Sequence, residues 1–271
     1  MSTRRFGIIG FPLGHSLSPL LHNHGFAEHG LDAVYEAWPV LPEELRGFFA
    51  RARRIPIAGM SVTIPHKQAV ARLADQVTQR ARDVGAVNTL FWREGELWGE
   101  NTDVSGIVEP LRALKRDFGS ALVLGAGGAA RAAMAGLVEL GVGSIAVANR
   151  SLDKAEALAR DFKATAIPWG ERLTHRAGLL VNATPLGMSG SEAKASPMPA
   201  SALDPACVVF DLVYNPLETV LLRSARARGC KTVAGLEMFL HQGLGQFRLW
   251  TGLELNPARA RALLLDALAG L

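Results

Sequence analysis

A cluster of glycines that follows a short apolar run constrains this chain more than any other stretch. The apolar run Leu122–Leu124 predicts a buried strand, and it leads through the glycines into a helix-like segment, Ala129–Leu140. Small residues at Gly125, Gly127 and Ala130 permit a tight turn, a close backbone approach and close helix–strand packing. The N–H groups at the start of the helix then face a phosphate. The pattern predicts a dinucleotide-binding turn, although any α/β protein can use such glycines for a tight turn alone.

The end of the following strand indicates which dinucleotide is bound. An NAD-selective site needs an acidic residue about 20 residues beyond the glycines, where it binds the ribose 2′-hydroxyl. The expected strand 144–148 is followed instead by Asn149, Arg150, Ser151 and, one helical turn later, Lys154. Arg150 offers a planar pair of donors to a 2′-phosphate, Ser151 offers a hydroxyl and Lys154 adds charge. These residues favour NADP; the alternative is that Arg150 is an ordinary surface residue and Ser151 only caps a helix.

Length and composition fit a globular enzyme of about two domains. The chain has 271 residues, of which 49% are hydrophobic, and a net charge of +4. The basic residues are scattered along the chain, so nucleic-acid binding has no support, and the slight positive balance favours anionic small molecules. We expect a small-molecule substrate and a monomer or homodimer.

Cysteine use and the absence of long apolar stretches predict a cytoplasmic protein. Cys207 and Cys230 are too few for a zinc site or a disulfide framework, and their apolar surroundings predict buried, reduced thiols. Arg4 and Arg5 precede only four apolar residues, too few for a secretory signal. No stretch is long enough to span a membrane.

The N-terminal third alternates strand-like and helical segments. We expect strands at 6–9, 34–38, 57–62, 86–91 and 96–99, and helices ending near 29 and spanning 42–54, 81–84 and 104–115. Ser18 before Pro19 predicts a helix N-cap, so Ser16 and Ser18 either bind a ligand carboxylate above a strand end or only cap the turn. Lys67 falls in the first turn of a helix, where the macrodipole disfavours a cation. That placement indicates a functional lysine or a solvated one.

From residue 120 onward strands and helices alternate, which predicts a doubly wound parallel sheet. Further strands are expected at 164–167, 179–182, 208–212 and 231–233, and helices at 217–228, 235–250 and 257–268. Ala183–Gly187 and Tyr214–Pro216 each follow a strand, so they should line the crevice where such sheets bind ligands. Phe239, Phe247 and Trp250 share one helical face and predict core packing.

The histidines favour local hydrogen bonds over metal binding. His22 and His24 are two residues apart and face different ways on a helix. Imidazoles in such positions ordinarily bond to nearby groups. His66 adjoins Lys67 and is expected at the rim of the active site.

Several separated motifs resemble the shikimate dehydrogenase family along essentially the whole chain. They are Gly10-x-Pro12-x-x-His15-Ser16-x-Ser18-Pro19-x-x-His22-Asn23, Val62-Thr63-x-Pro65-x-Lys67, Gly85-Ala86-Val87-Asn88-Thr89, Asn101-Thr102-Asp103, the glycine loop, Asn149-Arg150, Asn182-Ala183-Thr184-Pro185, Asp211-x-x-Tyr214-x-Pro216, and Gly235-x-x-Met238 followed by Gln242. The resemblance implies reversible, NADPH-dependent reduction of 3-dehydroshikimate to shikimate in aromatic amino-acid (chorismate) biosynthesis. Relatives with the same motifs oxidise quinate or related acids, and a non-catalytic NADP-binding regulator on this fold is a further alternative.

The resemblance also assigns roles to residues by position. Lys67 and Asp103 resemble the catalytic pair, with a structural ion pair as the alternative; the Lys67 ammonium would protonate the oxygen that gains charge during hydride transfer. The expected substrate contacts are Ser16, Ser18, Thr63, Lys67, Asn88, Asp103, Tyr214 and Gln242. The expected nucleotide contacts, including Gly125 and Ser151 from the pattern itself, are Gly125, Gly127, Gly128, Ala129, Asn149, Arg150, Ser151, Lys154, Thr184, Gly235 and Met238.

The domain organisation follows from the resemblance as well. It implies an α/β fold in which a discontinuous substrate-binding and catalytic domain, residues 1–103 and 239–271, is joined to a Rossmann-type doubly wound NADP domain, residues 104–238. The active site is expected in the cleft between them. Three residues depart from the family pattern: Ser61 replaces a common Asn, Val104 a common Gly, and Glu237 a small residue. These departures leave the choice between shikimate, quinate and related acids open.

Overall fold

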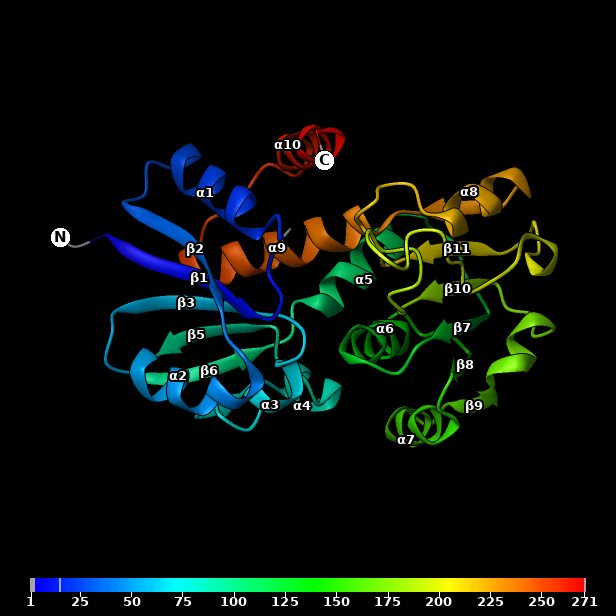
Figure 1. Cartoon of the computed structure of the whole chain (residues 1–271), viewed down its shortest axis with the longest axis horizontal. Coiled ribbons are helices and arrows are strands. Elements are labelled where there is room, and N and C mark those ends of the chain that lie inside the picture. Colours follow the sequence, from blue (N-terminus) through cyan, green and yellow to red (C-terminus); the bar gives the residue numbers. More distant parts are fainter. Residues whose placement is uncertain (1–2, 15, 271) are drawn as a thin grey trace. The chain divides into compact units, whose positions relative to one another are not determined.

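The computed structural model describes residues 3–14 and 16–270 and divides the chain into two compact units (Figure 1). The first unit contains the described residues up to Thr102 together with Gln242–Ala269. The second unit contains Asp103–His241. His15, which belongs to the first family motif, lies outside the described residues.

The first unit is built on a six-stranded mixed sheet with the order β2-β1-β3-β5-β6-β4. Its strands are β1 (Arg4–Gly10), β2 (Ala33–Pro39), β3 (Ile57–Val62), β4 (Gln76–Val77), β5 (Thr89–Arg93) and β6 (Glu96–Glu100). Strand β1 pairs in parallel with β2 and β3, whereas β5 runs antiparallel to β3 and β6. The sequence did not predict β4, because two residues are too few to show an alternating pattern.

Helices cover both faces of this sheet. They are α1 (Ser18–Glu28), the short 3-10 helix η1 (Pro42–Glu44), α2 (Leu45–Ala52), α3 (Lys67–Val70), α4 (Gln79–Val84), the C-terminal part of α9 (Gly235–Thr251) and α10 (Pro257–Ala269). Phe6 of β1 packs against Phe26 of α1 and Trp250 of α9, with ring centroids 5.0 and 5.4 Å apart. Ile9 of the same strand joins a core that includes Phe49 of α2. Apolar residues on the two faces of β1 therefore pack into two different cores.

His22 of α1 lies inside this aromatic core. Its ring stacks on Tyr35 at 4.6 Å and is fully buried. Nε2 pairs with Oε1 of Gln246 at 3.2 Å, while Nδ1 has no hydrogen-bond partner among the described residues. The expected local hydrogen bonding is therefore met at one ring nitrogen only. Burial lowers the pKa of His22 from 6.5 to about 3, so the imidazole is neutral in the folded protein at neutral pH.

This buried imidazole predicts a loss of stability in acid. The unfolded chain protonates His22 near pH 6.5 and the folded protein only near pH 3, so acidification between these values favours unfolding. The contribution of His22 to the free energy of unfolding should fall by about 1.4 kcal/mol per pH unit in this window. Urea unfolding between pH 7 and pH 4.5 should therefore show a shallower pH slope for His22→Gln. His29→Gln, at the end of the same helix, should keep the wild-type slope; equal slopes in all three proteins would contradict a neutral buried His22.

The second unit is a six-stranded sheet with the order β12-β11-β10-β7-β8-β9. Its strands are β7 (Ser120–Leu124), β8 (Ser144–Asn149), β9 (Thr165–Pro168), β10 (Leu179–Asn182), β11 (Val208–Asp211) and β12 (Lys231–Val233). Each of these strands runs parallel to its neighbours. The order matches that of a Rossmann fold, and it reverses between β7 and β10. The predicted doubly wound sheet is confirmed.

Helices lie on both faces of this second sheet (Figure 1). They are α5 (Asp103–Arg112), α6 (Gly128–Glu139), α7 (Leu152–Phe162), α8 (Val220–Ala227), the N-terminal part of α9, and the 3-10 helices η2 (Trp169–Leu173) and η3 (Ala200–Ala202). Val123 shares one core with Leu137 of α6 and Leu158 of α7. Leu124, the next residue of β7, shares the other core with Leu222 of α8. Alternate residues of the buried strand thus face opposite layers, as its continuous apolar sequence requires.

Three local predictions are wrong. Leu17, and not Ser18, occupies the N-cap position of α1, because the helix already includes Ser18 as its first residue. Strand β5 begins at Thr89, since the N–H of Val87 donates to the carbonyl of Lys67 instead of to a neighbouring strand. Helix α8 begins at Val220, because the hydroxyl of the preceding threonine caps it.

Two further sequence predictions can be compared with the structure. Cys207 and Cys230 are buried and free, as expected. In the part of the chain that the structure describes, every helix is too short or too polar to cross a membrane.

Candidate active site

The glycine loop forms a turn that most side chains would disrupt. Gly125 has a φ of 109°, and a Cβ there would lie 2.9 Å from the carbonyl oxygen of Ala183. The turn after β7 therefore lies directly against the loop after β10, at the point where the strand order reverses. Gly127 is the N-cap residue of α6, and a Cβ there would meet nothing within 4 Å. The N–H groups of Gly128 and Ala129 follow in the first turn, so an open, positively polarised helix end is available to an anion.

The residues after β8 present positive charge. Arg150 and Lys154 are exposed, and the Asn149 side-chain amide donates to the carbonyl of Ser151 at 3.0 Å, which fixes the turn into α7. The Ser151 hydroxyl donates to the carboxylate of Asp153, and this bond lowers the pKa of Asp153. The sequence analysis did not predict that Asp153 would bind the Ser151 hydroxyl, although Asp153 lies only two residues after Ser151. The two cations are therefore the stronger candidates for a phosphate ligand.

A buried polar group holds the loop that carries Thr184. Asn182 ends β10, and its Oδ1 accepts from the Thr184 backbone at 3.0 Å and the Thr184 hydroxyl at 2.7 Å. The amide nitrogen of Asn182 donates to Asp211 at 2.8 Å. Asp211 is fully buried and also accepts from the Thr219 hydroxyl at 2.6 Å; burial raises its pKa. Two side chains at adjacent strand ends thus fix the conformation of the predicted cofactor residue Thr184.

The start of α9 lies against the loop after β11. Gly235 contacts the carbonyl oxygen of Val213 so closely that no Cβ would fit. The ring of Tyr214 packs on Phe239 at 4.9 Å, and burial raises the pKa of Tyr214. Met238 is buried, and Glu237, half-buried in the same turn, lies 4.0 Å from His241. The second unit therefore brings together Gly235, Met238 and Tyr214.

In the first unit the loops after β1 and β3 lie side by side. The N–H of Phe11 donates to the carbonyl of Ile64 at 3.0 Å, and that of Thr63 donates to the carbonyl of Ile9 at 2.9 Å. Ser16 Oγ accepts from the N–H of Ser18 at 3.3 Å. Ser16 and Thr63 thus belong to neighbouring loops at the carboxyl ends of parallel strands, where ligands bind in α/β sheets, and Ser18 begins the helix that follows the first of these loops.

Lys67 and Asn88 are linked through the backbone. Lys67 is the first residue of α3, as predicted, and its carbonyl accepts from the N–H of Val87 at 2.8 Å. Asn88 is buried, and its Oδ1 accepts from the N–H of Thr102 at 2.7 Å. The prediction that His66 lines the rim is wrong, because this ring is buried and bonds to the carbonyl of Val40 at 2.7 Å.

The remaining predicted residues occupy helices. Asp103 is the first residue of α5 in the second unit and is 3% exposed. A carboxylate in the first turn is stabilised by the helix dipole. Gln242 is buried in α9, in the part that belongs to the first unit. Of the residues that depart from the family pattern, Val104 is buried in α5 and Ser61 is buried in β3.

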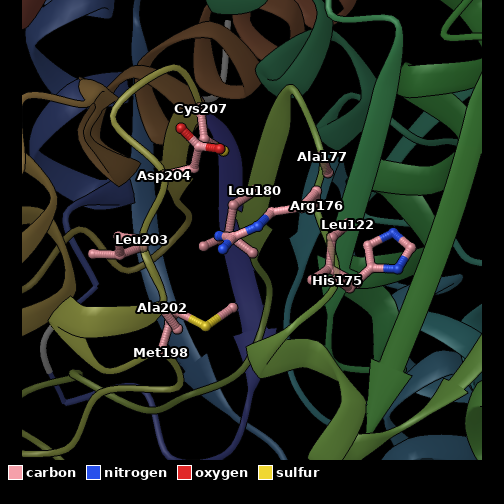
Figure 2. A pocket seen from close by; sticks show the side chains of 10 residues that line it. All are labelled: Leu122, His175, Arg176, Ala177, Leu180, Met198, Ala202, Leu203, Asp204 and Cys207. Carbon is pink, nitrogen blue, oxygen red and sulfur yellow. The ribbon is translucent and has the colours of Figure 1, made fainter.

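A pocket in the second unit is lined by residues other than those predicted to bind a ligand (Figure 2). Leu180 of β10 and Cys207, just before β11, line it together with Arg176 and Asp204. Burial raises the pKa of Cys207 to about 12, so this thiol stays protonated at neutral pH. None of the residues predicted to bind a ligand is among those that line this pocket.

The strand order and the glycine loop place the second unit in the class of Rossmann-type dinucleotide-binding domains. Three family models match successive parts of the chain: shikimate dehydrogenase substrate binding domain at 8–90, shikimate / quinate 5-dehydrogenase at 113–183, and shikimate 5′-dehydrogenase C-terminal domain at 235–265. A shikimate dehydrogenase (NADP(+)) from Maridesulfovibrio salexigens is 53% identical over 263 residues, which cover 97% of each chain. The chain belongs to the shikimate dehydrogenase family.

Solved structures agree with this membership. Shikimate 5-dehydrogenase from Thermus thermophilus, in complex with NADP(H) and shikimate, is 42% identical with a TM-score of 0.89, over 97% of this chain and 99% of that one. Quinate dehydrogenase from Corynebacterium glutamicum, in complex with NAD, is 32% identical with a TM-score of 0.90, over 98% of this chain and 100% of that one. The family thus includes enzymes for two related acids, so membership alone does not choose the substrate.

Proposed function

We infer that this protein is an NADP-dependent shikimate dehydrogenase, an oxidoreductase that acts on a CH–OH group and reversibly reduces 3-dehydroshikimate to shikimate in aromatic amino-acid biosynthesis. The observation that carries this inference is the 53% identity to a shikimate dehydrogenase (NADP(+)) over 97% of both chains. Quinate dehydrogenase is the second candidate, because a quinate enzyme matches the structure with a TM-score of 0.90.

The first unit is proposed to bind the substrate. Ser16 and Ser18 donate hydrogen bonds to the substrate carboxylate, and Thr63, Asn88, Gln242 and, from the second unit, Tyr214 bind the rest of the molecule. Neighbouring loops that carry Ser16 and Thr63, with Ser18 at the start of the helix that follows, support this assignment. The proposed domain bounds remain 1–103 with 239–271 for substrate and catalysis, and 104–238 for NADP.

The second unit is proposed to bind NADP, whose nicotinamide supplies or accepts the hydride when it is bound. The open N-terminus of α6 would hold the pyrophosphate through Gly127, Gly128 and Ala129. Arg150 and Lys154 would bind the 2′-phosphate. The tight fit of Gly125 against the loop of Thr184 supports a preformed nucleotide site.

Lys67 and Asp103 are proposed to carry the proton chemistry. The Lys67 ammonium donates a proton from Nζ to the carbonyl oxygen as negative charge develops there, and in the reverse direction its free amine accepts that proton. The hydroxyl that forms at the reduced carbonyl donates a hydrogen bond to the Asp103 carboxylate, which orients it. The buried position of Asp103 in the first turn of α5 supports a fixed orientation.

We propose the cellular compartment from the state of the two cysteines. Two buried, free cysteines fit a reducing compartment such as the cytoplasm. We propose a monomer or homodimer that requires neither nucleic acid nor a membrane as a partner.

The function is tested by comparing kcat/KM for shikimate and quinate, each with NADP and NAD, from the absorbance of reduced nicotinamide. We expect turnover to be strongest for shikimate with NADP. A preference for quinate or for NAD would keep the hydride chemistry and move the protein to the second candidate. No turnover in any of the four mixtures would refute an enzyme and favour an NADP-binding regulator.

A further inference from the structure

A cluster of buried polar side chains lies in the first unit, outside the residues assigned to substrate. It consists of His22 of α1, Tyr35 of β2, Ser61 of β3, Thr89 of β5 and Gln246 of α9, each at most 3% exposed. Buried polar groups are costly unless each finds a hydrogen-bond partner. The arrangement of their hydrogen bonds therefore shows what the cluster holds in place.

Gln246 is the centre of this cluster. Its Oε1 accepts from the Ser61 hydroxyl at 2.9 Å and faces His22 Nε2 at 3.2 Å. Its Nε2 donates to the Thr89 hydroxyl at 3.1 Å and to the backbone carbonyl of Asn88 at 3.2 Å. A carbonyl oxygen only accepts, so the side-chain amide of Gln246 has one allowed orientation.

One end of the cluster is the hydroxyl of Tyr35. The Tyr35 hydroxyl donates to the Ser61 hydroxyl at 2.6 Å, and the Ser61 hydroxyl in turn donates to Gln246 Oε1. Tyr35 is held by its stacking on His22 and by a hydrogen bond from its backbone N–H to the side-chain Oδ1 of Asn23. A rigid phenol therefore fixes the direction of the Ser61 hydroxyl, which donates to Gln246.

The other end of the cluster reaches Asn88. The Thr89 hydroxyl accepts from Gln246 and donates to Asn88 Oδ1 at 2.8 Å. The same oxygen accepts from the N–H of Thr102 at 2.7 Å. Because Oδ1 accepts these bonds, the orientation of the Asn88 amide is fixed, and its nitrogen donates to the Thr102 hydroxyl at 2.9 Å.

We propose that Tyr35, Ser61 and Gln246 are positioning residues, which hold the Asn88 side chain in one geometry before shikimate binds. This assignment deepens the proposed function and rests on it. Side chains that are already ordered lose little conformational freedom when a ligand binds, so the cluster should act on substrate affinity. The cofactor residues belong to the other unit and share no hydrogen bond with the cluster among the bonds described above.

Two substitutions test the proposal at separate places. Tyr35→Phe keeps the stacked ring and removes the hydroxyl that donates to Ser61. Gln246→Met keeps the side-chain length and removes every hydrogen bond of the amide. We expect KM for shikimate to rise about 10-fold for Tyr35→Phe and more for Gln246→Met, as the loss of a buried hydrogen bond implies. KM for NADP should stay within about twofold of wild type, and kcat should change less than KM for shikimate.

Thr251→Val is the matched control on the same helix. It removes a hydroxyl that donates to the carbonyl of Phe247 at 2.7 Å and belongs to no part of the cluster. Both kinetic constants should stay at wild-type values. Ser61→Ala, a single-atom deletion, takes the place of Gln246→Met if the latter does not fold, with a smaller rise in the same direction.

Three outcomes would overturn the assignment. If Tyr35→Phe and Gln246→Met fold but leave KM for shikimate unchanged, the cluster does not position Asn88 for substrate binding. An equal rise of KM for shikimate and for NADP would indicate general loosening of the fold. Absence of shikimate turnover by the unsubstituted protein would refute the proposed function itself, and with it this assignment.

Discussion

Replacement of Lys67 by alanine is expected to lower kcat for shikimate oxidation by about 10²–10⁴-fold, the range that general acid–base groups contribute. The Lys67 side chain is the proposed proton donor and acceptor at the reacting oxygen. Lys67 is the first residue of α3, a helix of a single turn. The dissociation constant of NADP should change little, because the nucleotide residues lie in the second unit.

Two control variants separate the loss of the Lys67 amine from a change in side-chain size and from damage to α3. Lys67→Met keeps most of the side-chain length without the amine and should lose as much turnover as Lys67→Ala. Gln68→Ala, at the exposed neighbour in α3, should keep wild-type kcat. Wild-type turnover in Lys67→Ala would remove this residue from the mechanism and leave the structural ion pair as its role.

The second large effect is expected at the end of β8. Arg150→Ala should raise KM for NADP by about 10- to 100-fold, because a hydrogen bond to a charged group contributes about 1.5–3 kcal/mol. KM for NAD, which has no 2′-phosphate, should hardly change. The Ser151 hydroxyl is already bonded to Asp153, so it offers little compensation for the lost guanidinium.

Arg160→Ala provides the matched control, since it removes an exposed arginine from the last turn of the same helix α7. Steady-state kinetics with both nucleotides should leave this variant unchanged. An equal loss with NADP and NAD in Arg150→Ala would rule out a 2′-phosphate contact and point to an effect on the turn before α7.

The second sheet and its glycine loop were predictable because their signals are local in sequence. Strand β10 begins and ends at the predicted residues, Leu179 and Asn182, since a short apolar run bounded by turns defines a buried strand. Gly125 has the positive φ that a glycine in a tight turn indicates. The residue pattern alone therefore reached the sheet, its order of elements and the NADP preference, while the division into two units came from the family resemblance.

The buried cluster around Gln246 was not predictable in this way. Its partners are separated by up to 224 residues along the chain, and periodicity predicts which residues are buried but not which polar atoms meet. The wrong N-cap at Ser18 has a different origin, because α1 begins one residue earlier than the local Ser-Pro pattern predicts. The departure from the family pattern at Ser61 is likewise explained only by partners in β2 and α9.

The use of α9 in the first unit affects the order in which the protein folds during synthesis. Apart from the last residues of the chain, the second unit is the continuous segment Asp103–His241, so it can fold once residue 241 has left the ribosome. The first unit cannot close its core until Trp250 is made, because this residue packs against Phe6 across almost the whole chain. Until α9 docks, Ser61 and Thr89 lack the amide of Gln246. A nascent chain therefore acquires a folded nucleotide-binding unit before it acquires the ordered cluster around Gln246, and truncation after His241 should yield the first without the second.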